Sequence, residues 1–333
     1  MNHFCRLLLG VLLASLALGC QQTNSPDANA DTDNLSAMTT LPAIDDLWDF
    51  QDPEASEKAF RELLEQASDN EPYYREVQTQ IARTHSLRGQ FDEAHEILDE
   101  VSEALPSVGH LVEVRYLLER GRTWNSSGEK ERAKAVFLQA YNLAKEDALD
   151  FYEIDAAHML GIVEQPEQAL EWNLVALAKT EATDDQKAKK WIGPLANNIG
   201  WTYHDQGDFE NALKFFRKGL EFRETTGAEP GLRIAKWTVA RGLRSLGKVK
   251  EALAMQHAII DEYYSEVDPA AADLDPTSID GYVVEEIGEC LWALGKEEEA
   301  KPYLANAYKI LSQDDWMVKN EKDRLDSLKS RGE

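Results

Sequence analysis

The sequence has few basic residues relative to acidic ones. Its 333 residues include 35 Lys and Arg against 61 Asp and Glu, which gives a formal net charge of −26 at pH 7. A general nucleic-acid binder carries a basic footprint, and broad electrostatic attraction to anionic lipid also needs clustered Lys and Arg. The charge balance therefore excludes the first class and disfavours the second.

Long apolar runs are missing after the N-terminus. A bilayer-spanning helix needs about 20 apolar residues, whereas the run Leu7–Leu18 is shorter and has the length of a signal-peptide core. This run leads into Ala17-Leu18-Gly19-Cys20, which resembles the lipobox of bacterial lipoproteins. The resemblance implies a signal peptide over residues 1–19 and lipidation of Cys20. The alternative is an ordinary secretory signal that is cut nearby.

A polar linker follows this cysteine. Residues 20–46 are rich in Asn, Asp, Ser, Thr and Ala and show no helical periodicity, which predicts a disordered tether. In Gram-negative lipoproteins an Asp after the lipidated cysteine commonly signals retention in the inner membrane, and here the residue is Gln21. The resemblance therefore implies an outer-membrane anchor facing the periplasm, with membrane contact through the lipid alone.

Motifs for chemistry are also missing. The seven histidines show no metal-ligand spacing, and the sequence has no Gly-rich phosphate loop, nucleophile elbow or carboxylate dyad. Cys5 belongs to the signal, so Cys290 is left as the one cysteine besides Cys20 and cannot form an internal disulfide. We expect Cys290 to be a small buried apolar residue. The sequence predicts no enzyme, no cofactor and no metal site.

What the sequence does have is a recurring pair of small residues twelve positions apart. The first members are Ala82, Gly121, Ala157, Gly200, Ala240 and Gly288. The second members are Ala94, Ala133, Ala169, Ala212, Ala252 and Ala300. Between them, in five of the six copies, a glycine ends the first helical pattern: Gly89, Gly128, Gly207, Gly247 and Gly295. The pattern resembles the tetratricopeptide repeat (TPR), a helical hairpin that stacks on copies of itself.

The copies depart from the family pattern in several places. Successive second members are 39, 36, 43, 40 and 48 residues apart, whereas family repeats are about 34 residues long. Glu164 replaces the turn glycine of the third copy. Asn173 and Gln256 stand where Phe137 and Phe216 are expected to fill the helix interface.

The resemblance implies an all-α fold, a right-handed α-solenoid of about six TPR hairpins over residues 71–312. Residues 47–70 are predicted to hold an N-terminal helix, because Asp52-Pro53 suits a helix start. Residues 313–333 are predicted to form a C-terminal capping helix, since solenoids need polar end caps. The acidic stretch Glu266 to Thr277 is expected to be a loop or joint between the fifth and sixth hairpins.

In the TPR family the first helix of each hairpin lines a concave groove. The expected groove positions lie three residues before, one after and four after the first small residue. These triplets are Thr79, Arg83 and Ser86; Leu118, Arg122 and Asn125; Ile154, His158 and Gly161; Asn197, Trp201 and His204; Trp237, Arg241 and Arg244; Glu285, Glu289 and Trp292. Five of the six triplets contain no acid, and arginine and tryptophan dominate protein-binding hot spots. The candidate groove residues are Arg83, Arg122, Asn125, Asn197, Trp201, Trp237, Arg241 and Arg244.

These residues predict a protein or peptide partner with an acidic or C-terminal segment, because guanidinium groups bind carboxylates bidentately. Arg241 and Arg244 are the best candidates for that contact. The sequence thus favours a non-catalytic interaction scaffold in the cell envelope. The TPR lipoprotein of the outer-membrane β-barrel assembly machinery is a precedent for the class. The alternatives are a solute-binding lipoprotein that holds a small anionic ligand and an enzyme whose site is assembled from distant repeats.

Overall fold

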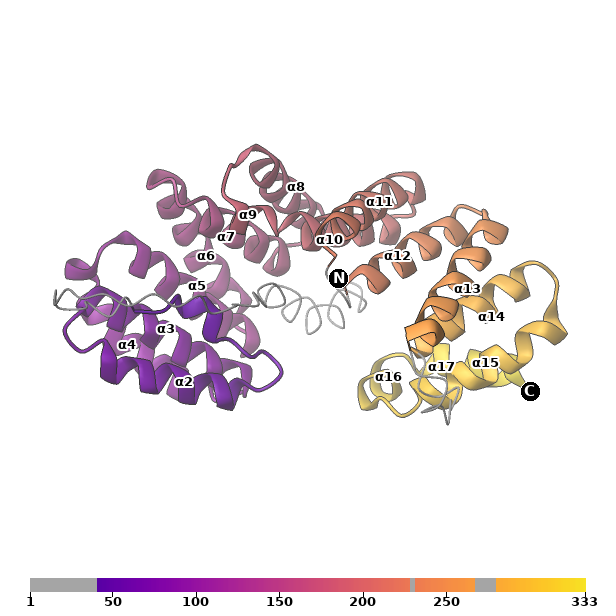
Figure 1. Ribbon diagram of the computed structural model, residues 1–333, viewed down its shortest axis with the longest axis horizontal. Coiled ribbons are helices and arrows are strands. Elements are labelled where there is room, and N and C mark those ends of the chain that lie inside the picture. Colours follow the sequence, from indigo (N-terminus) through magenta and orange to yellow (C-terminus); the bar gives the residue numbers. More distant parts are fainter. Residues whose placement is uncertain (1–40, 228–230, 267–279) are drawn as a thin grey trace, which may run out of the picture. The chain divides into compact units, whose positions relative to one another are not determined.

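The computed structural model describes residues 41–227, 231–266 and 280–333, and all regular elements in these ranges are helices (Figure 1). The prediction of an all-α helical repeat solenoid is confirmed. The predicted signal peptide, Cys20 and the tether as far as residue 40 lie outside the described residues. So does nearly all of the joint predicted between the fifth and sixth hairpins.

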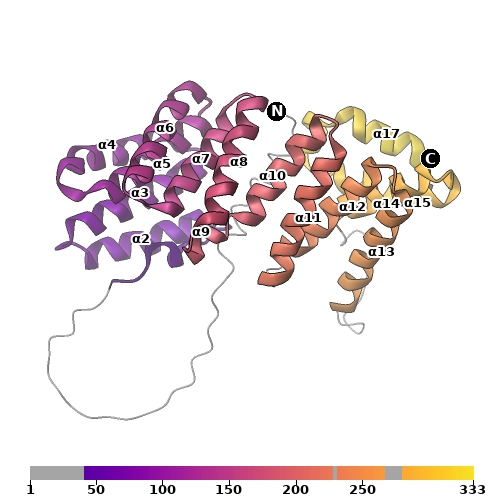
Figure 2. The same ribbon diagram turned by 90° about the horizontal axis from the view of Figure 1, so that it is seen from above.

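The described chain divides into two compact units, residues 41–192 and residues 193–333, which we treat separately. The N-terminal unit begins with the 3-10 helix η1 (Ile44–Leu47) and α2 (Pro53–Gln66) and ends with the short α9 (Gln186–Lys189). Its three hairpins are α3 (Glu71–Leu87) with α4 (Phe91–Val108), α5 (His110–Ser126) with α6 (Lys130–Glu146), and α7 (Asp150–Val163) with α8 (Pro166–Ala182). Figure 2 shows these helices from above.

The C-terminal unit continues the pattern with three more hairpins. These are α10 (Ile192–Asp205) with α11 (Phe209–Thr226), α12 (Gly231–Ser245) with α13 (Val249–Glu266), and α14 (Gly281–Ala293) with α15 (Glu297–Leu311). Two short helices follow, α16 (Asp315–Asn320) and α17 (Lys322–Gly332). In each hairpin the helix that comes first in the sequence, called the first helix below, carries the first small residue: α3, α5, α7, α10, α12 and α14.

The small residues lie where the two helices of a hairpin come closest. A Cβ atom added to Gly200 would lie 2.5 Å from Phe216 Cδ1 and 3.3 Å from the carbonyl oxygen of Ala212. A Cβ added to Gly288 would lie 2.6 Å from Leu304 Cδ2. The side chain on the second helix occupies the space that the missing methyl group leaves. This is the packing role predicted for the repeat.

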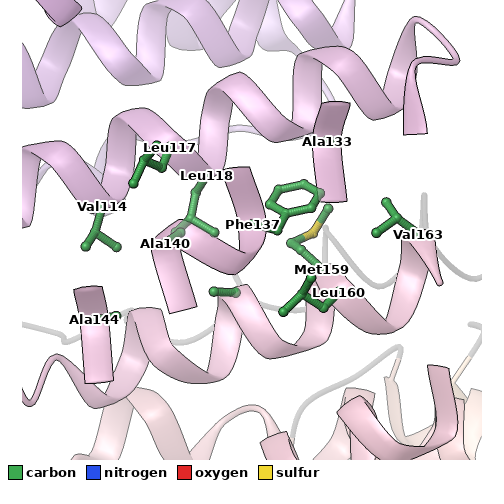
Figure 3. Close-up of a cluster of buried hydrophobic side chains, with 11 residues drawn as sticks. Val114, Leu117, Leu118, Ala133, Phe137, Ala140, Ala144, Met159, Leu160 and Val163 are labelled. Atoms are coloured by element: carbon green, nitrogen blue, oxygen red, sulfur yellow. The ribbon is translucent and has the colours of Figure 1, made fainter. Parts of the chain in front are cut away.

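Figure 3 shows how such hairpins share a core in the N-terminal unit. The ring of Phe137, fully buried on α6, lies between Leu118 of α5 and Met159 of α7. Asn173 and Gln256, which replace such an aromatic ring in two other hairpins, are buried as well. Asn173 Nδ2 donates to the carbonyl oxygen of Ala169, one turn earlier on the same helix.

The turns follow the predicted glycines. Gly89, Gly128, Gly207, Gly247 and Gly295 all have φ between +72° and +93°, which is the left-handed region that glycine enters without steric cost. The third turn is built differently, because Glu164 is extended (φ −78°, ψ 168°) and Pro166 begins the next helix. A proline at the first helical position needs no hydrogen-bond donor there.

Both ends of the repeat array are covered by helices that lie outside the six hairpins. At the N-terminus α2 packs on α3, as expected for a lone second helix. Ile44, placed in the tether by sequence, is 4% exposed and packs with Phe60 and Leu63, so the folded chain begins earlier than residue 47. At the C-terminus the predicted cap consists of two helices, of which α17 packs on α15 and buries Leu328.

Within the described residues, no helix combines the length and the apolar character that crossing a bilayer requires.

Candidate functional site

The first helices carry the predicted groove residues on one side, which we call the first-helix face. In the N-terminal unit this face belongs to α3, α5 and α7, and it holds a chain of ion pairs. Arg83 Nη1 on α3 lies 3.4 Å from Glu119 Oε1 on α5. Arg122 Nη1 donates to the same oxygen at 2.7 Å, and its Nη2 bonds both carboxylate oxygens of Asp155 on α7 at 2.6 Å. The two predicted arginines are therefore joined through carboxylates of the chain itself.

The C-terminal unit has a corresponding cluster on α12 and α14. Arg241 Nη1 donates to Glu286 Oε1 at 2.8 Å. Arg244 Nε donates to Glu286 Oε2 at 2.7 Å and its Nη2 to Oε1 at 2.9 Å, which is a bidentate pair. Glu286 is 2% exposed. The structure thus brings Arg241 and Arg244 together, as predicted, and places a buried carboxylate between them.

These pairs follow one register. In each pair the arginine directly follows the small residue of one first helix. Its partner acid lies two residues before the small residue of the next first helix. The three pairs are Arg83 with Glu119, Arg122 with Asp155, and Arg241 with Glu286. The sequence reasoning missed these acids because it read only the positions three before, one after and four after the small residue. The spacing itself was visible in the sequence.

Burial and pairing act in opposite directions on these charges. Burial disfavours the charged form of Arg122, but Asp155 and Glu119 outweigh it and raise the pKa of this guanidinium. Burial raises the pKa of Glu286, although Arg244 opposes the shift. An arginine stays charged under all ordinary conditions. The first-helix face therefore carries fixed ion pairs rather than free cations.

The predicted tryptophans form an aromatic row along the C-terminal unit. The ring centroids of Trp201 on α10 and Trp237 on α12 are 5.9 Å apart, and Tyr282 on α14 follows 6.0 Å beyond Trp237. Trp237 Nε1 also donates to the carbonyl oxygen of Tyr282 at 3.2 Å. Consecutive first helices thus each supply one ring. Such spacing falls in the range favoured by aromatic pairs.

The two predicted asparagines occupy different settings. Asn125 is half-buried in the last turn of α5, and Asn197 is half-buried on α10. Asn197 Nδ2 is buried without a hydrogen-bond partner in the described part of the chain. Cys20, the predicted lipidation site, lies outside the described residues.

The sixth first helix reaches the C-terminal cap. Glu285 pairs with Arg324 of α17, and Glu289 pairs with Arg331 of the same helix. Helix α17 therefore contacts α14 as the first helix of a further repeat would. Its two arginines neutralise the acids that distinguish the sixth triplet from the other five.

A further cluster, centred on Arg115, was not anticipated from the sequence. Arg115 Nη1 donates to Glu76 Oε1 at 2.8 Å and to Tyr152 Oη at 2.7 Å, which links α5 to α3 and α7. Arg115 Nη2 lies 3.1 Å from Asp45 Oδ1, in the segment that precedes α2. Burial raises the pKa of Tyr152 to about 12. Nothing in the local sequence of Arg115 predicts these three partners.

The described residues offer no group of three or more metal-ligating side chains. Cys290 is buried on α14, as predicted, and burial raises the pKa of its thiol to about 12. A thiol with a raised pKa is a poor nucleophile, because the thiolate is the reactive form.

Comparison with protein families identifies the repeat. Residues 195–226, which cover α11 and most of α10, match the family model described as "Tetratricopeptide repeat". This hairpin therefore resembles a tetratricopeptide repeat, and the helical hairpins on either side of it share its fold. TPR repeats generally mediate protein or peptide binding and are typically non-catalytic.

Several solved structures share this fold at low sequence identity. The apo form of RapI is 13% identical, with a TM-score of 0.62 over 83% of this chain and 80% of that one. A signal-transduction ATPase with a tetratricopeptide-repeat sensor, from Pyrococcus horikoshii, is 15% identical, with a TM-score of 0.60 over 84% of this chain and 45% of that one. The APC/C hetero-tetramer Cut9–Hcn1 is 13% identical, with a TM-score of 0.55 over 87% of this chain and 48% of that one. The comparison with curated proteins found no match.

Proposed function

We propose that this TPR protein is a non-catalytic interaction scaffold of the cell envelope. Lipid on Cys20 anchors it to the outer membrane, and the repeats face the periplasm. The sequence Ala17-Leu18-Gly19-Cys20, followed by a polar tether, supports the anchor. The partner is a protein or peptide segment that lies along a first-helix face.

The observation that carries the scaffold role is the alignment of functional side chains on successive first helices. In the C-terminal unit the aromatic row of Trp201, Trp237 and Tyr282 runs beside the cluster of Arg241, Arg244 and Glu286. Arginine supplies directional donors to a partner, whereas Trp201 and Trp237 are only 4% and 7% exposed and pack against each other between the first helices. A linear ligand that crosses α12 and α14 meets the arginine cluster formed by these two helices.

The arginines suit an acidic segment or a C-terminal carboxylate even though they already hold Glu286. A guanidinium group has five N–H donors, and the bonds to Glu286 use one from Arg241 and two from Arg244. The remaining N–H groups can donate to both oxygens of a second carboxylate. A small anionic solute would use the same donors, and the experiment below separates the two.

The test is purification of the full-length protein from native membranes, followed by mass spectrometry of what is retained. The scaffold role predicts one dominant polypeptide, whereas a retained small anion would select the solute-binding alternative. A matched variant, Arg241→Gln with Arg244→Gln and Glu286→Gln, removes the charges together and leaves no carboxylate unpaired. We expect this variant to retain at least tenfold less of the polypeptide than wild type does.

The control for this variant is Lys214→Gln with Arg217→Gln on α11. Both residues are exposed on a second helix, away from the first-helix face. Equal retention by wild type and control, with loss from the triple variant, supports the proposal. Equal retention by all three proteins would contradict it.

A further inference from the structure

Residues 41–50, called the N-terminal segment below, lie on the first-helix face of the N-terminal unit. Tyr73 Oη on α3 donates to the carbonyl oxygen of Pro42 at 2.6 Å. Asp45 forms ion pairs with Arg115 of α5 and with Lys187 of α9. Its partner Lys187 is 142 positions away in the sequence. One short segment therefore touches three separate helices of the unit.

The second half of the segment is aromatic. The rings of Trp48 and Phe50 are stacked with centroids 4.7 Å apart. The guanidinium carbon of Arg83 lies 5.4 Å from the Trp48 ring and 5.3 Å from the Phe50 ring, within cation–π range. Trp48 Nε1 donates to Gln80 Oε1 at 3.0 Å. Arg83, a predicted groove residue, is thus covered by aromatic side chains of the same chain.

The site is electrostatically adapted to an acid at the position of Asp45. Burial opposes ionisation of Asp45, but Arg115 and Lys187 outweigh burial and lower the pKa of this carboxyl. Arg115 is itself held by Glu76 and Tyr152, so its orientation does not depend on Asp45. A preorganised cation of this kind binds a carboxylate without first having to be ordered.

The segment makes the contacts of a cap, since Ile44 and Trp48 pack on Phe60 of α2, and it makes further contacts that a cap does not need. A cap would contact α2 and α3, whereas this segment also reaches α5 and α9. Its recognised groups are an acid, a tryptophan three residues later and an aromatic ring two residues after that. Of the contacting side chains, those of Asp45 and Lys187 are 40% and 42% exposed, so water can reach this pair and assist its exchange.

We propose that the first-helix face of the N-terminal unit is a peptide site filled in cis by the N-terminal segment, and that it accepts a partner protein's segment with the same acid–aromatic pattern. This inference rests on the proposed function, since it names the ligand of one first-helix face. The segment and the partner compete, because both need Arg115, Lys187 and Arg83. A segment tethered in cis has an effective concentration of the order of millimolar, so the filled site accepts a partner only weakly until the segment leaves.

The test uses the full chain and a labelled synthetic peptide with the sequence of residues 41–50, LPAIDDLWDF. A released variant, Asp45→Lys with Trp48→Ala, places a like charge beside Arg115 and Lys187 and removes the main aromatic contact. We expect fluorescence anisotropy to give a dissociation constant for the peptide at least tenfold lower for this variant than for wild type. The control Asp46→Lys makes the same charge change at an exposed neighbour that has no ion pair among the described residues, and we expect it to behave as wild type.

Two further measurements locate the bound peptide and guard against misfolding. In the released background, Lys187→Ala should weaken peptide binding at least fivefold. A peptide with Asn at the position of Asp45 should bind at least fivefold more weakly than one with Asn at the position of Asp46. The milder variant Asp45→Asn should fall between wild type and the released variant. Circular dichroism should show unchanged helix content in each protein.

The proposal is overturned if a folded released variant and wild type bind the peptide equally, or if neither binds it. Concentration-dependent dimerisation of wild type, lost in the released variant, would assign the site to exchange of segments between copies instead. These outcomes are separate from failure of the scaffold role. The scaffold role fails when no polypeptide is retained from native membranes, whatever the synthetic peptide does.

Discussion

Arg122 Nη2 on α5 bonds both carboxylate oxygens of Asp155 on α7, and this pair joins two successive first helices of the N-terminal unit. The Asp155 side chain is 7% exposed and that of Arg122 is 14% exposed. A buried carboxylate is tolerated only when it is paired and hydrogen-bonded. The arginines of the first-helix face therefore contribute to the packing of repeats in addition to any contact with a ligand.

Asp155→Asn should destabilise the protein, because it leaves the mostly buried Arg122 with one fewer carboxylate. Removing one partner of a buried pair costs about 3 kcal/mol. The matched control is Glu129→Gln, which breaks the exposed pair with Arg132 and should cost less than about 1 kcal/mol. Urea denaturation followed by circular dichroism measures both. Similar losses in the two variants would show that the Arg122–Asp155 pair has no special structural role.

Two glycine substitutions in the fourth hairpin should have opposite effects. Gly200→Ala should destabilise by about 1–3 kcal/mol, because its methyl group would meet Phe216 at 2.5 Å. Gly219→Ala should stabilise by about 0.5–1 kcal/mol, since its methyl group would lie 3.6 Å from Ala196 Cβ and alanine favours the helix. A denaturation midpoint of Gly200→Ala at or above that of wild type would contradict the close approach at Gly200.

Stability should fall in acid in a way that depends on His158. Burial lowers the pKa of this residue to about 4, with partial opposition from Asp155, while the unfolded residue titrates near 6.5. Below about pH 6.5 His158 binds a proton in the unfolded chain but stays neutral in the folded chain. The free energy of unfolding therefore decreases as the pH falls to about 4, and below that pH this decrease levels off. The loss in the free energy of unfolding that His158 causes between these pH values is of the order of 3 kcal/mol.

The measurement compares wild type with His158→Gln by urea denaturation at pH 7, 6, 5 and 4. The variant lacks this titration, so its free energy of unfolding should fall less than that of wild type over the same range. Other acids and bases of the fold titrate in both proteins and cancel in the difference. Parallel curves would show that His158 does not titrate differently in the folded and unfolded chains.

Cys20→Ser should release the protein from the membrane fraction if Cys20 carries the anchor. Lipoproteins of this type carry three acyl chains, and one chain alone already gives marginal binding. We expect the variant to accumulate unprocessed or in the soluble fraction after washing at high salt, which removes electrostatic attachment. A Cys290→Ser variant is the control for loss of a thiol. Retention of Cys20→Ser in the washed membranes would contradict the lipid anchor.

Much of the fold could be predicted because small residues at a fixed spacing report a local constraint. Gly200 and Ala212 belong to one hairpin, so the packing that requires them involves residues close together in the sequence. The left-handed turn glycines, such as Gly207, follow from backbone sterics alone. The first folded residue was harder to predict from the sequence, because Ile44 packs on α2 and α3 through contacts with Phe60 and Val77.

The candidate site was predicted only in part, because its partners come from distant positions. Arg122 lies on the first helix α5, but its partner Asp155 lies 33 residues away and meets it only when hairpins stack. Recognition of the repeat register could have found this acid. The contact of Asp45 with Lys187 spans 142 residues and involves a helix outside the repeats, so no repeat pattern indicates it.

The central claim is that partners bind along the first-helix faces, and site-specific photocrosslinking in living cells tests it most directly. The crosslinking residue replaces Asn125 on α5 or Asn197 on α10, both half-buried on first helices. The controls replace Leu138 on α6 and Val175 on α8, which are exposed at 41% and 42% on second helices. These controls are more accessible to random collision than the test positions.

The account predicts one discrete crosslinked polypeptide from Asn125 or Asn197 and none, or much less of it, from Leu138 and Val175. Its yield should fall when the protein also carries Arg241→Gln, Arg244→Gln and Glu286→Gln, if the crosslink comes from Asn197. Crosslinks of the same polypeptide from the second-helix positions, with none from the first-helix positions, would contradict the account.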